Sequence, residues 1–333
     1  MAEISASAGP RWGRVALIVL AALLLPFFVS NYTVFQLSMV VAYAIALVGL
    51  NLLTGFSGQI SLGHGAFFAI GAYTAAIMMD RYELPYWATI PAAALVCLIA
   101  GFLFGLPALK LEGHYLALAT YALAVALPQL LKFKHLEGFT GGVQGIVIIK
   151  PDPPIRDLFG IAINADRWLY LFSLAVALVM FWIGWNLIRG RIGRALIAIR
   201  DQPIAAASMG INMPMYKSLA FGISALYTGV AGALSAILVA FVAPDSFNVL
   251  LSITLMVGMV IGGIATLSGA IWGAIFVQFI PNIADQISKA APWAIYGVTL
   301  ILFMYLMPGG IAGGLRMLAA RLKALGARGA GAP

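Results

Sequence analysis

Residues 51–73 read NLLTGFSGQISLGHGAFFAIGAY, with glycines and polar side chains recurring inside a run that is otherwise apolar. Glycine weakens a helix and a polar side chain is costly in lipid, so the combination favours a helix that breaks within the membrane. Backbone groups freed by such a break are tolerated only in the protein interior or beside a water-filled cavity. The stretch therefore predicts a broken helix that contributes Gln59, Ser61, Gly63 and His64 to a translocation path.

His64 has two interpretations. An ionisable residue inside a membrane is a functional candidate by default. A neutral histidine that holds two helices together by hydrogen bonds explains the same residue without any contact to a solute. The sequence leaves both interpretations open.

The composition of the whole chain agrees with a location in the membrane. Of its 333 residues, 63% are hydrophobic and only 9% are charged, against about 25% charged residues in a soluble domain. So few charges cannot solvate a water-facing surface, whereas a surface that faces lipid needs none. We expect an all-α, polytopic transmembrane helical bundle that forms a single domain over residues 1–333.

A helix needs about 20 mostly apolar residues to cross the hydrocarbon core. The apolar runs predict about ten such helices, with eight or nine as alternatives because two of them form one stretch that we divide near residues 266–269. The predicted spans are 14–30, 33–53, 60–79, 86–108, 114–132, 168–188, 218–241, 249–265, 269–286 and 293–308. Arg11 and Arg14 precede the first run as in a signal peptide, but residues 28–30 make a poor cleavage site, so we expect an uncleaved helix.

Two patterns of small residues concern helix packing. Gly258 and Gly262 have the spacing that allows close helix packing, as do Gly269 and Gly273. Similar small-residue runs also open at residues 61–63 and 266–268, which suggests a two-fold internal repeat of the kind that transporters often have.

The distribution of Lys and Arg orients the predicted helices. With both termini in the cytoplasm, most basic residues lie near cytoplasmic span ends, as the positive-inside rule requires. The net charge of +8 then reflects anchoring to the inner leaflet and not binding of nucleic acid. This arrangement assigns a long external loop at 133–167, a long inner loop at 189–217 and a basic cytoplasmic tail at 316–333.

The inner loop has the pattern of a docking element. Residues 191–200 are basic and could form a helix, Asp201-Gln202-Pro203 interrupts them, and a second short helix is expected at 204–209 before Gly210. A short helix, turn and short helix is an unusual shape for a mere connector. The alternative is a solvated surface loop.

Signals for an enzyme or a metal site are missing from the sequence. There is no Gly-Lys dipeptide and hence no P-loop, the histidines are far apart, and the single Cys97 permits no internal disulfide. We therefore expect no enzymatic activity, no metal and no cofactor. A transporter with no nucleotide site of its own is passive, coupled to an ion, or driven by another protein.

Many short fragments, taken in order, resemble the permeases of branched-chain amino-acid ABC importers. They are NLLTG at 51–55, SGQISLGH at 57–64, GAY at 71–73, YLALAT at 115–120, TGG at 140–142, GRA at 193–195, AIRD at 198–201, AA at 205–206, GIN at 210–212, YKSLAF at 216–221, PDSF at 244–247, GG at 262–263 and MPGG at 307–310. The resemblance covers residues 33–315, and the later fragments are more similar to the M-type subunit than to its H-type partner.

The resemblance implies a function for the inner loop. Such permeases carry an Ala-Ala-x-x-x-Gly motif that fits a cleft in the ATPase, with Ile204 here in place of the usual leading Glu. At helical spacing the second Ala and the Gly lie one turn apart on one face, which would let a partner approach closely. The ATPase-coupling residues are then Arg194, Arg200, Asp201, Ala205, Ala206 and Gly210, and the two arginines would meet acidic groups on the ATPase. The fragment at 115–120 adds Tyr115 and Thr120 to the translocation-path candidates.

The resemblance also implies the rest of an importer. It implies a heterodimer with a second permease subunit, two cytoplasmic ABC ATPases, an external solute-binding protein and a location in the bacterial cytoplasmic membrane. The solute would be a branched-chain or other hydrophobic amino acid. Val125 and Gln144 depart from residues common in the family, which keeps urea, amides and aromatic acids as alternative solutes. A standalone transporter or channel is the alternative from another class, and it would need no inner docking loop.

Overall fold

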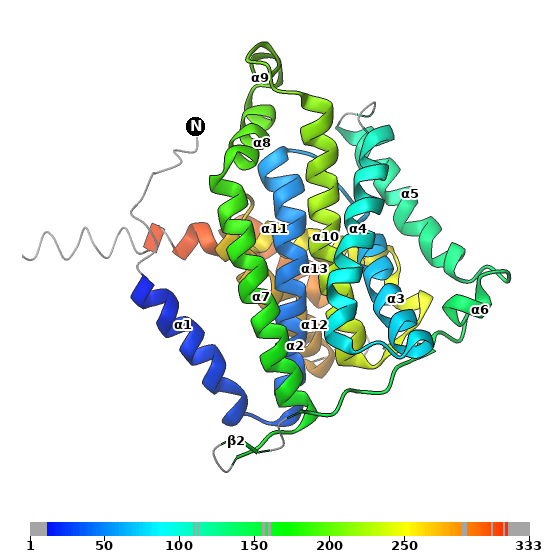
Figure 1. Cartoon of the computed structure of the whole chain (residues 1–333). Helices are drawn as coiled ribbons and strands as arrows, with labels where there is room; N and C mark the ends of the chain where they lie inside the picture. The colour runs from blue at the N-terminus through cyan, green and yellow to red at the C-terminus, as the bar shows by residue number, and fades with distance from the viewer. Residues whose placement is uncertain are drawn as a thin grey trace, which may run out of the picture.

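The computed structural model describes residues 12–108, 111, 113–154, 157–158, 161–287, 292–307, 309–315 and 317–318. Apart from residues 317 and 318, the predicted basic tail at 316–333 lies outside this part of the chain. Several basic residues used to orient the spans, among them Arg11 and Lys110, lie outside it too. The described chain is almost entirely helical (Figure 1).

Each predicted span contains a helix. These helices are α1 (Trp12–Leu24) with η1 (Leu25–Phe27), α2 (Asn31–Leu50), α3 (His64–Tyr82), α4 (Tyr86–Ala108), α5 (His114–Leu131), α7 (Ala165–Arg189), α10 (Met213–Val239), α11 (Val249–Gly262), α12 (Leu267–Ile287) and α13 (Pro292–Leu306). By length and composition, 6 helical segments of the described chain could cross a membrane, and two apolar helices are shorter. The all-α bundle is confirmed, while the count of ten crossings and the two-fold repeat stay predictions.

Helices α2 and α10 form the centre of the bundle. Ser30 Oγ accepts a hydrogen bond from the N–H of Thr33 at the start of α2, and Asn212 Oδ1 accepts one from the N–H of Met215 at the start of α10. Both helices are apolar on all sides, and most of their residues are buried. A helix of that kind belongs in the core. The two helices run side by side in Figure 1.

Small residues let the neighbouring helices approach α10 closely. Gly71 of α3 lies against the backbone of Gly229, and the carbonyl of Phe68 lies against Gly232. A side chain at either glycine of α10 would collide with a neighbouring helix, so the close contacts depend on the missing Cβ atoms. Helix α4 packs along α10 as well, and α7 packs against α2.

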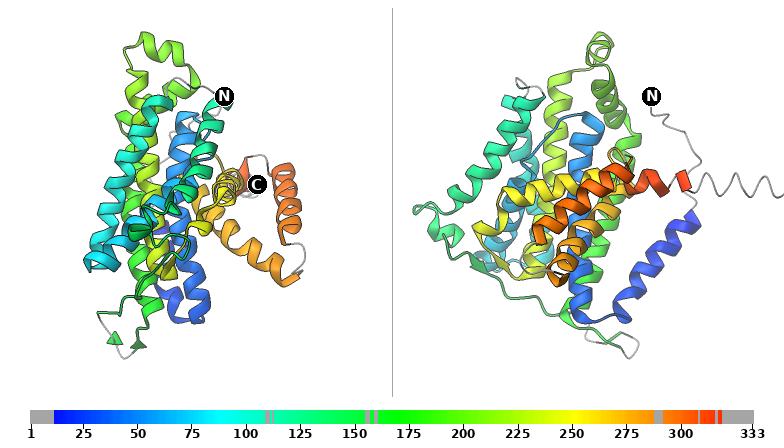
Figure 2. Two further views of the ribbon diagram at one scale, coloured as in Figure 1. Left: turned by 90° about the vertical axis from the view of Figure 1, so that its right-hand side faces the viewer. Right: turned by 180° about the vertical axis from the view of Figure 1, so that it is seen from behind.

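Helices α11, α12 and α13 form a second group behind α2 and α10, and α12 and α13 extend away from the main body (Figure 2). Gly262 packs on the backbone of Gly269, and Gly273 packs on the carbonyl of Gly258. Since no side chain separates the two helices at these points, the close packing of α11 and α12 expected from the glycine spacing is confirmed.

The two ends of the bundle carry different elements. At one end β1 (Ile146–Val147) pairs with β4 (Phe241–Val242), near α6 (Glu137–Thr140), η3 (Pro244–Phe247) and a hairpin of β2 (Asp157–Leu158) and β3 (Ile161–Ala162). An ion pair between Lys132 and Asp245 joins α5 to η3 at this end. At the other end α8 (Arg191–Asp201) and α9 (Pro203–Ser208) project beyond the bundle (Figure 1).

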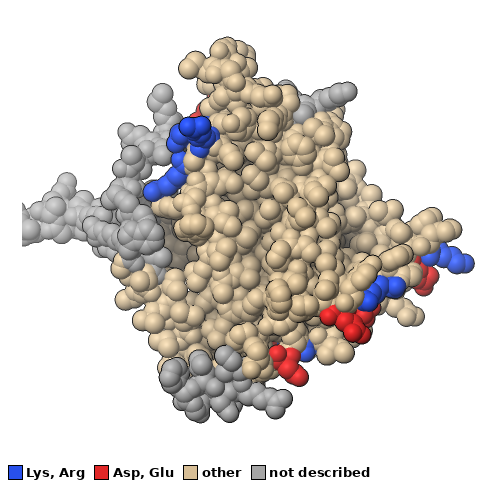
Figure 3. Space-filling view, in the orientation of Figure 1, with Lys and Arg blue, Asp and Glu red and all other residues tan. Residues whose placement is uncertain are grey.

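Charged side chains avoid the middle of the molecule. On the face seen in Figure 3, Lys, Arg, Asp and Glu lie near the edges, and a broad uncharged area separates them. Lipid tails offer no solvation to a charge, so this distribution is what a bilayer-facing surface requires.

Candidate functional site

The predicted break lies between α2 and α3. Helix α2 continues directly into the π-helical η2 (Asn51–Phe56), and the chain returns to helix only at His64. The predicted helix at 60–79 therefore begins too early, because residues 58–63 are not helical. Gly58 has a φ of 74°, and a Cβ there would lie 2.9 Å from Cγ of Arg200, so the turn needs glycine on both conformational and steric grounds.

Carbonyls freed by the break find partners within the chain. The carbonyl of Leu53 accepts from the N–H of Gln59 at 3.2 Å, and Thr54 Oγ1 donates to the carbonyl of Gln59 at 3.0 Å. The carbonyl of Gly55 accepts from Arg200 Nη1 at 2.7 Å. A guanidinium suits this position because the C-terminal end of a helix carries partial negative charge.

His64 links the break to the two central helices. Its Nε2 lies 2.6 Å from Ser224 Oγ of α10, and Ser224 Oγ donates to the carbonyl of Gly49 of α2 at 2.6 Å. Because a hydroxyl has one proton, Ser224 must accept from His64 Nε2–H. A buried charge with no counter-ion is costly, which favours the neutral ring, so Nδ1 of His64, 3.2 Å from Ser61 Oγ, accepts the hydroxyl proton of Ser61. His64 is 1% exposed and ties three segments together.

Helices α5 and α11 close the other sides of the break. Thr120 Oγ1 of α5 accepts from the N–H of Leu62 at 2.9 Å, and Ser252 Oγ of α11 accepts from the N–H of Gly65 at 2.9 Å. A Cβ on Gly63 would lie 3.0 Å from the carbonyl oxygen of Thr120. The break is therefore filled by side chains of the protein itself.

Asn51 connects this break to the turn between α11 and α12. Its Oδ1 accepts from the N–H of Ala265 at 2.7 Å, and its Nδ2 donates to the carbonyl of Thr266 at 3.0 Å. Asn51 is buried, so both groups of the turn depend on this one amide. The π-helical turn η2 and the turn between α11 and α12 are consequently held together.

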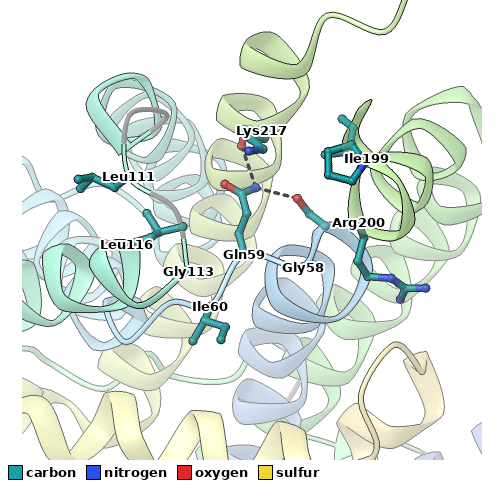
Figure 4. Close-up of a pocket in the computed structure, with 11 residues that line it drawn as sticks. Gly58, Gln59, Ile60, Leu111, Gly113, Leu116, Ile199, Arg200 and Lys217 are labelled. Carbon is teal, nitrogen blue, oxygen red and sulfur yellow. Dashed lines mark hydrogen bonds between the residues drawn. The ribbon is translucent and has the colours of Figure 1, made fainter. Parts of the chain in front are cut away.

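A pocket of about 210 Å³ lies where the break faces α8, α9 and the start of α10 (Figure 4). Gln59 lies at its centre, and its Nε2 donates to Ser57 Oγ at 2.7 Å and to the carbonyl of Lys217 at 3.5 Å. Leu111, Leu116 and Ile60 give it an apolar side. Among the described residues, no three His, Cys, Asp or Glu side chains gather closely enough to hold a metal ion.

The inner loop forms the expected helix pair, but its small residues are not arranged as predicted. Helix α9 ends at Ser208, and Gly210, with a φ of 81°, follows as a cap: the N–H of Ile211 bonds to the carbonyl of Ala206 at 3.1 Å. Ala206 is only 4% exposed. The prediction of one face shared by Ala206 and Gly210 is therefore wrong. Ala205 and Gly210 are exposed, whereas Ala206 packs inward.

Arg194 and Arg200, the two arginines predicted to meet the ATPase, lie in different surroundings. Arg194 is exposed and donates to the carbonyl of Arg189 at 3.0 Å. The guanidinium of Arg200 bonds to Asp201 Oδ1 at 2.8 Å and to the carbonyl of Gly55, so it points into the protein as well as along the loop. Arg200 thus joins α8 directly to the π-helical turn.

Known proteins match the chain over most of its length. Residues 32–307 match the family described as "Branched-chain amino acid transport system / permease component". The chain belongs to this permease family.

Individual relatives agree with this assignment. The high-affinity branched-chain amino acid transport system permease protein LivM of Escherichia coli is 34% identical over 89% of this chain and 73% of its own length. LivM of Salmonella typhimurium is 33% identical over the same shares. BraD of Pseudomonas aeruginosa is 24% identical over 81% of this chain and 91% of its own length. No solved structure matches the chain. The permease is thus of the M type, as its sequence fragments suggest.

The structure of the permease brings most of the predicted path residues together. Ser61, Gly63, His64 and Thr120 meet around the break, all buried, and Gln59 lies beside them at the pocket. Tyr115 does not join them, since its side chain is 73% exposed on α5. Sequence reasoning also missed the partners Ser224 and Ser252, which are small polar residues in apolar spans and gave only a weak signal.

A second set of polar residues in the permease was missed altogether. They are Tyr43 on α2, Ser246 and Asn248 before α11, Thr254 on α11, and Gln278 and Asn282 on α12, and they line one hollow. A signal was available, because two amides four residues apart within the predicted span 269–286 lie on one helix face.

Proposed function

We propose that this permease moves branched-chain or other hydrophobic amino acids into the cell as one membrane subunit of an ABC importer. The observation that carries the proposal is the match to the branched-chain permease family over residues 32–307, supported by 34% identity to LivM. In this assembly it forms a heterodimer with a second permease, two cytoplasmic ATPases bind the pair, and an external binding protein delivers the solute.

The α8–α9 pair is the docking site of the ATPase in this proposal. The pair projects beyond the bundle, and its side chains Ile204 and Met209 are each 84% exposed. Large apolar side chains in water are costly to leave uncovered, so a partner surface is expected over them. Gly210 lies beside them with open space around its Cα.

Arg200 carries movement of the docking pair to the membrane region in this proposal. It is the residue of α8 whose guanidinium holds the carbonyl of Gly55, and its aliphatic stem lies against Gly58. A displacement of α8 by the ATPase would therefore displace the π-helical turn. Asn51 would pass this displacement to the turn between α11 and α12.

The topology is part of the proposal. Ten crossings with both termini in the cytoplasm put α8 and α9 on the inner face and the segment near Gly142 and Asp152 on the outer face. With the buried Cys97 changed to Ala, single cysteines at 143 and 152, both exposed, should react with an impermeant maleimide added outside intact cells, and a cysteine at 194 should not. Reaction at 194 from outside would reverse the orientation.

Gly210→Glu tests the docking function against a matched control. A Glu at 210 would place an unpaired charge in the covered surface at a cost of several kcal/mol, and about 1.4 kcal/mol is tenfold in affinity. The ATPases should then be lost from the purified complex, and uptake should stop. Gly210→Asn should retain them, because Asn tolerates the left-handed conformation and adds no charge. Docking and uptake that survive Gly210→Glu would contradict the function, and uptake with no ATPase present would favour a standalone transporter.

A further inference from the structure

A hollow of about 340 Å³ opens between α2, α11 and α12. We call it the outer hollow because the proposed topology places it in the outer half of the membrane region. Its polar lining consists of Tyr43, Ser246, Asn248, Thr254, Gln278 and Asn282. The volume lies at the low end of the range of about 300–1,000 Å³ that is typical of small-molecule sites.

These polar side chains are out of place on a surface that faces lipid. Helices α11 and α12 are mostly apolar, yet Thr254, Gln278 and Asn282 all line the same hollow. Polar groups within a bilayer almost always face the bundle interior or a water-filled cavity. The lining therefore indicates a space that holds water or a polar solute.

The hydrogen-bonding capacity of this lining is largely unused. Within the part of the chain that the structure describes, the side chains of Gln278, Ser246 and Tyr43 make no hydrogen bond. Thr254 Oγ1 donates only to the carbonyl of Leu250 in its own helix, at 2.7 Å. Asn282 Nδ2 donates to the carbonyl of Gln278, which leaves its Oδ1 free of partners among the described residues. Both donors and acceptors thus remain for a ligand.

The chemistry of the lining restricts the ligand. None of the described residues that line the hollow carries a charge, so a solute with net charge would lack a counter-ion. Amide and hydroxyl groups can accept from an ammonium and donate to a carboxylate at the same time. Leu250, Leu251 and Val277 offer an apolar side for an aliphatic chain. A zwitterion with an aliphatic side chain satisfies all three conditions.

We propose that the outer hollow is a solute-binding half-site in which Gln278, Asn282 and Thr254 hold the ammonium and carboxylate of an aliphatic amino acid on its way from the outer side. The inference rests on the proposed import function and names the place where the solute meets this permease. It also assigns the buried break around His64 to structure and coupling, because the polar groups there are already paired within the protein.

The first test measures leucine uptake by the complete importer reconstituted in vesicles with its binding protein and ATP. Gln278→Leu keeps the size of the side chain and removes its hydrogen bonds, so KM for leucine should rise about tenfold, as expected for one lost hydrogen bond to a charged group. Gln129→Leu is the matched control, since Gln129 is an exposed amide on α5 outside the hollow, and its KM should equal that of the wild type. An unchanged KM for Gln278→Leu would overturn the inference.

The second test does not depend on transport. In the complete importer with Cys97→Ala, Asn282→Cys should react with an impermeant maleimide from outside, and leucine with the binding protein should slow that reaction. Val143→Cys, at an exposed position, serves as the control that leucine does not protect. An inaccessible cysteine at 282, or one that leucine does not protect, would overturn the half-site. Protection at 282 together with ATP-independent uptake would instead overturn the ABC-import function and leave the half-site standing.

Discussion

The broken segment and the outer hollow both place polar side chains among apolar helices, and they differ in where the hydrogen bonds of those side chains go. Around the break, Ser61, His64 and Thr120 form hydrogen bonds that connect different segments of the chain. In the hollow, Thr254 and Asn282 bond only within their own helices. A polar residue inside a membrane protein therefore identifies a solute site only when its partners are missing from the chain, and burial alone does not decide it.

The largest loss of stability is expected when a bulky side chain is placed in the closely packed break. Gly63→Leu puts a side chain where a Cβ already lies 3.0 Å from the carbonyl oxygen of Thr120. Overpacking of this kind should destabilise the permease by about 3 kcal/mol. Gly297→Leu is the control, because Gly297 has open space around it. Unfolding of the purified subunits in SDS measures both, and equal stability of the two variants would show that the break is not closely packed.

The next effect compares two separate amide side chains, Asn51 beside the break and Asn282 in the outer hollow. Asn51→Leu leaves the N–H of Ala265 and the carbonyl of Thr266, both partly buried, without the side chain that pairs them, at a cost of about 2–3 kcal/mol. Asn282→Leu should change stability by no more than about 0.5 kcal/mol, because it removes a bond only within its own helix. The same unfolding measurement compares them. A reversed order would refute the distinction between paired and unpaired amides.

A smaller loss of stability is expected when the aromatic side chains of His64 and Tyr43 are each replaced by phenylalanine. His64→Phe keeps a ring in place and removes the bonds to Ser61 and Ser224, so we expect a loss of about 2 kcal/mol. Tyr43→Phe removes a hydroxyl that has no partner in the described chain and should leave stability unchanged. The melting temperatures of the two purified variants give the comparison. A His64→Phe variant as stable as the wild type would mean that the imidazole does not hold the helices together.

The smallest effect on stability, about 1 kcal/mol, is expected for Arg200→Lys. Lysine keeps the charge but lacks the planar guanidinium, which donates to Asp201 and to the carbonyl of Gly55 at the same time. The ATPases should still co-purify, while leucine uptake per ATP hydrolysed should fall several-fold. Arg81→Lys is the control and should behave as the wild type, because Arg81 is exposed at the end of α3 and lies outside the docking pair. An unchanged ratio for Arg200→Lys would remove the residue from the coupling route.

The sequence predicted the break and the loop pair well because both depend on local chemistry. Glycines and polar residues between 51 and 73 report a helix that cannot continue, and the Pro203 and Gly210 signals bound α9. It could not predict partners that the fold brings together, such as Ser224 for His64. We overlooked the outer hollow although Gln278 and Asn282 mark one face of α12, because only the packing of α11 against α12 brings Thr254 beside them.

The distance along the chain between His64 and Ser224 has a consequence for biosynthesis. They are 160 residues apart. A ribosome that adds about 5–20 residues per second needs about 8–30 s to make that length. In the proposed topology, α3 lies in the bilayer throughout that interval without the central helix α10, and its imidazole lacks its partner there. The nascent chain therefore passes through a stage in which membrane proteases and chaperones meet exposed polar groups that the finished protein conceals.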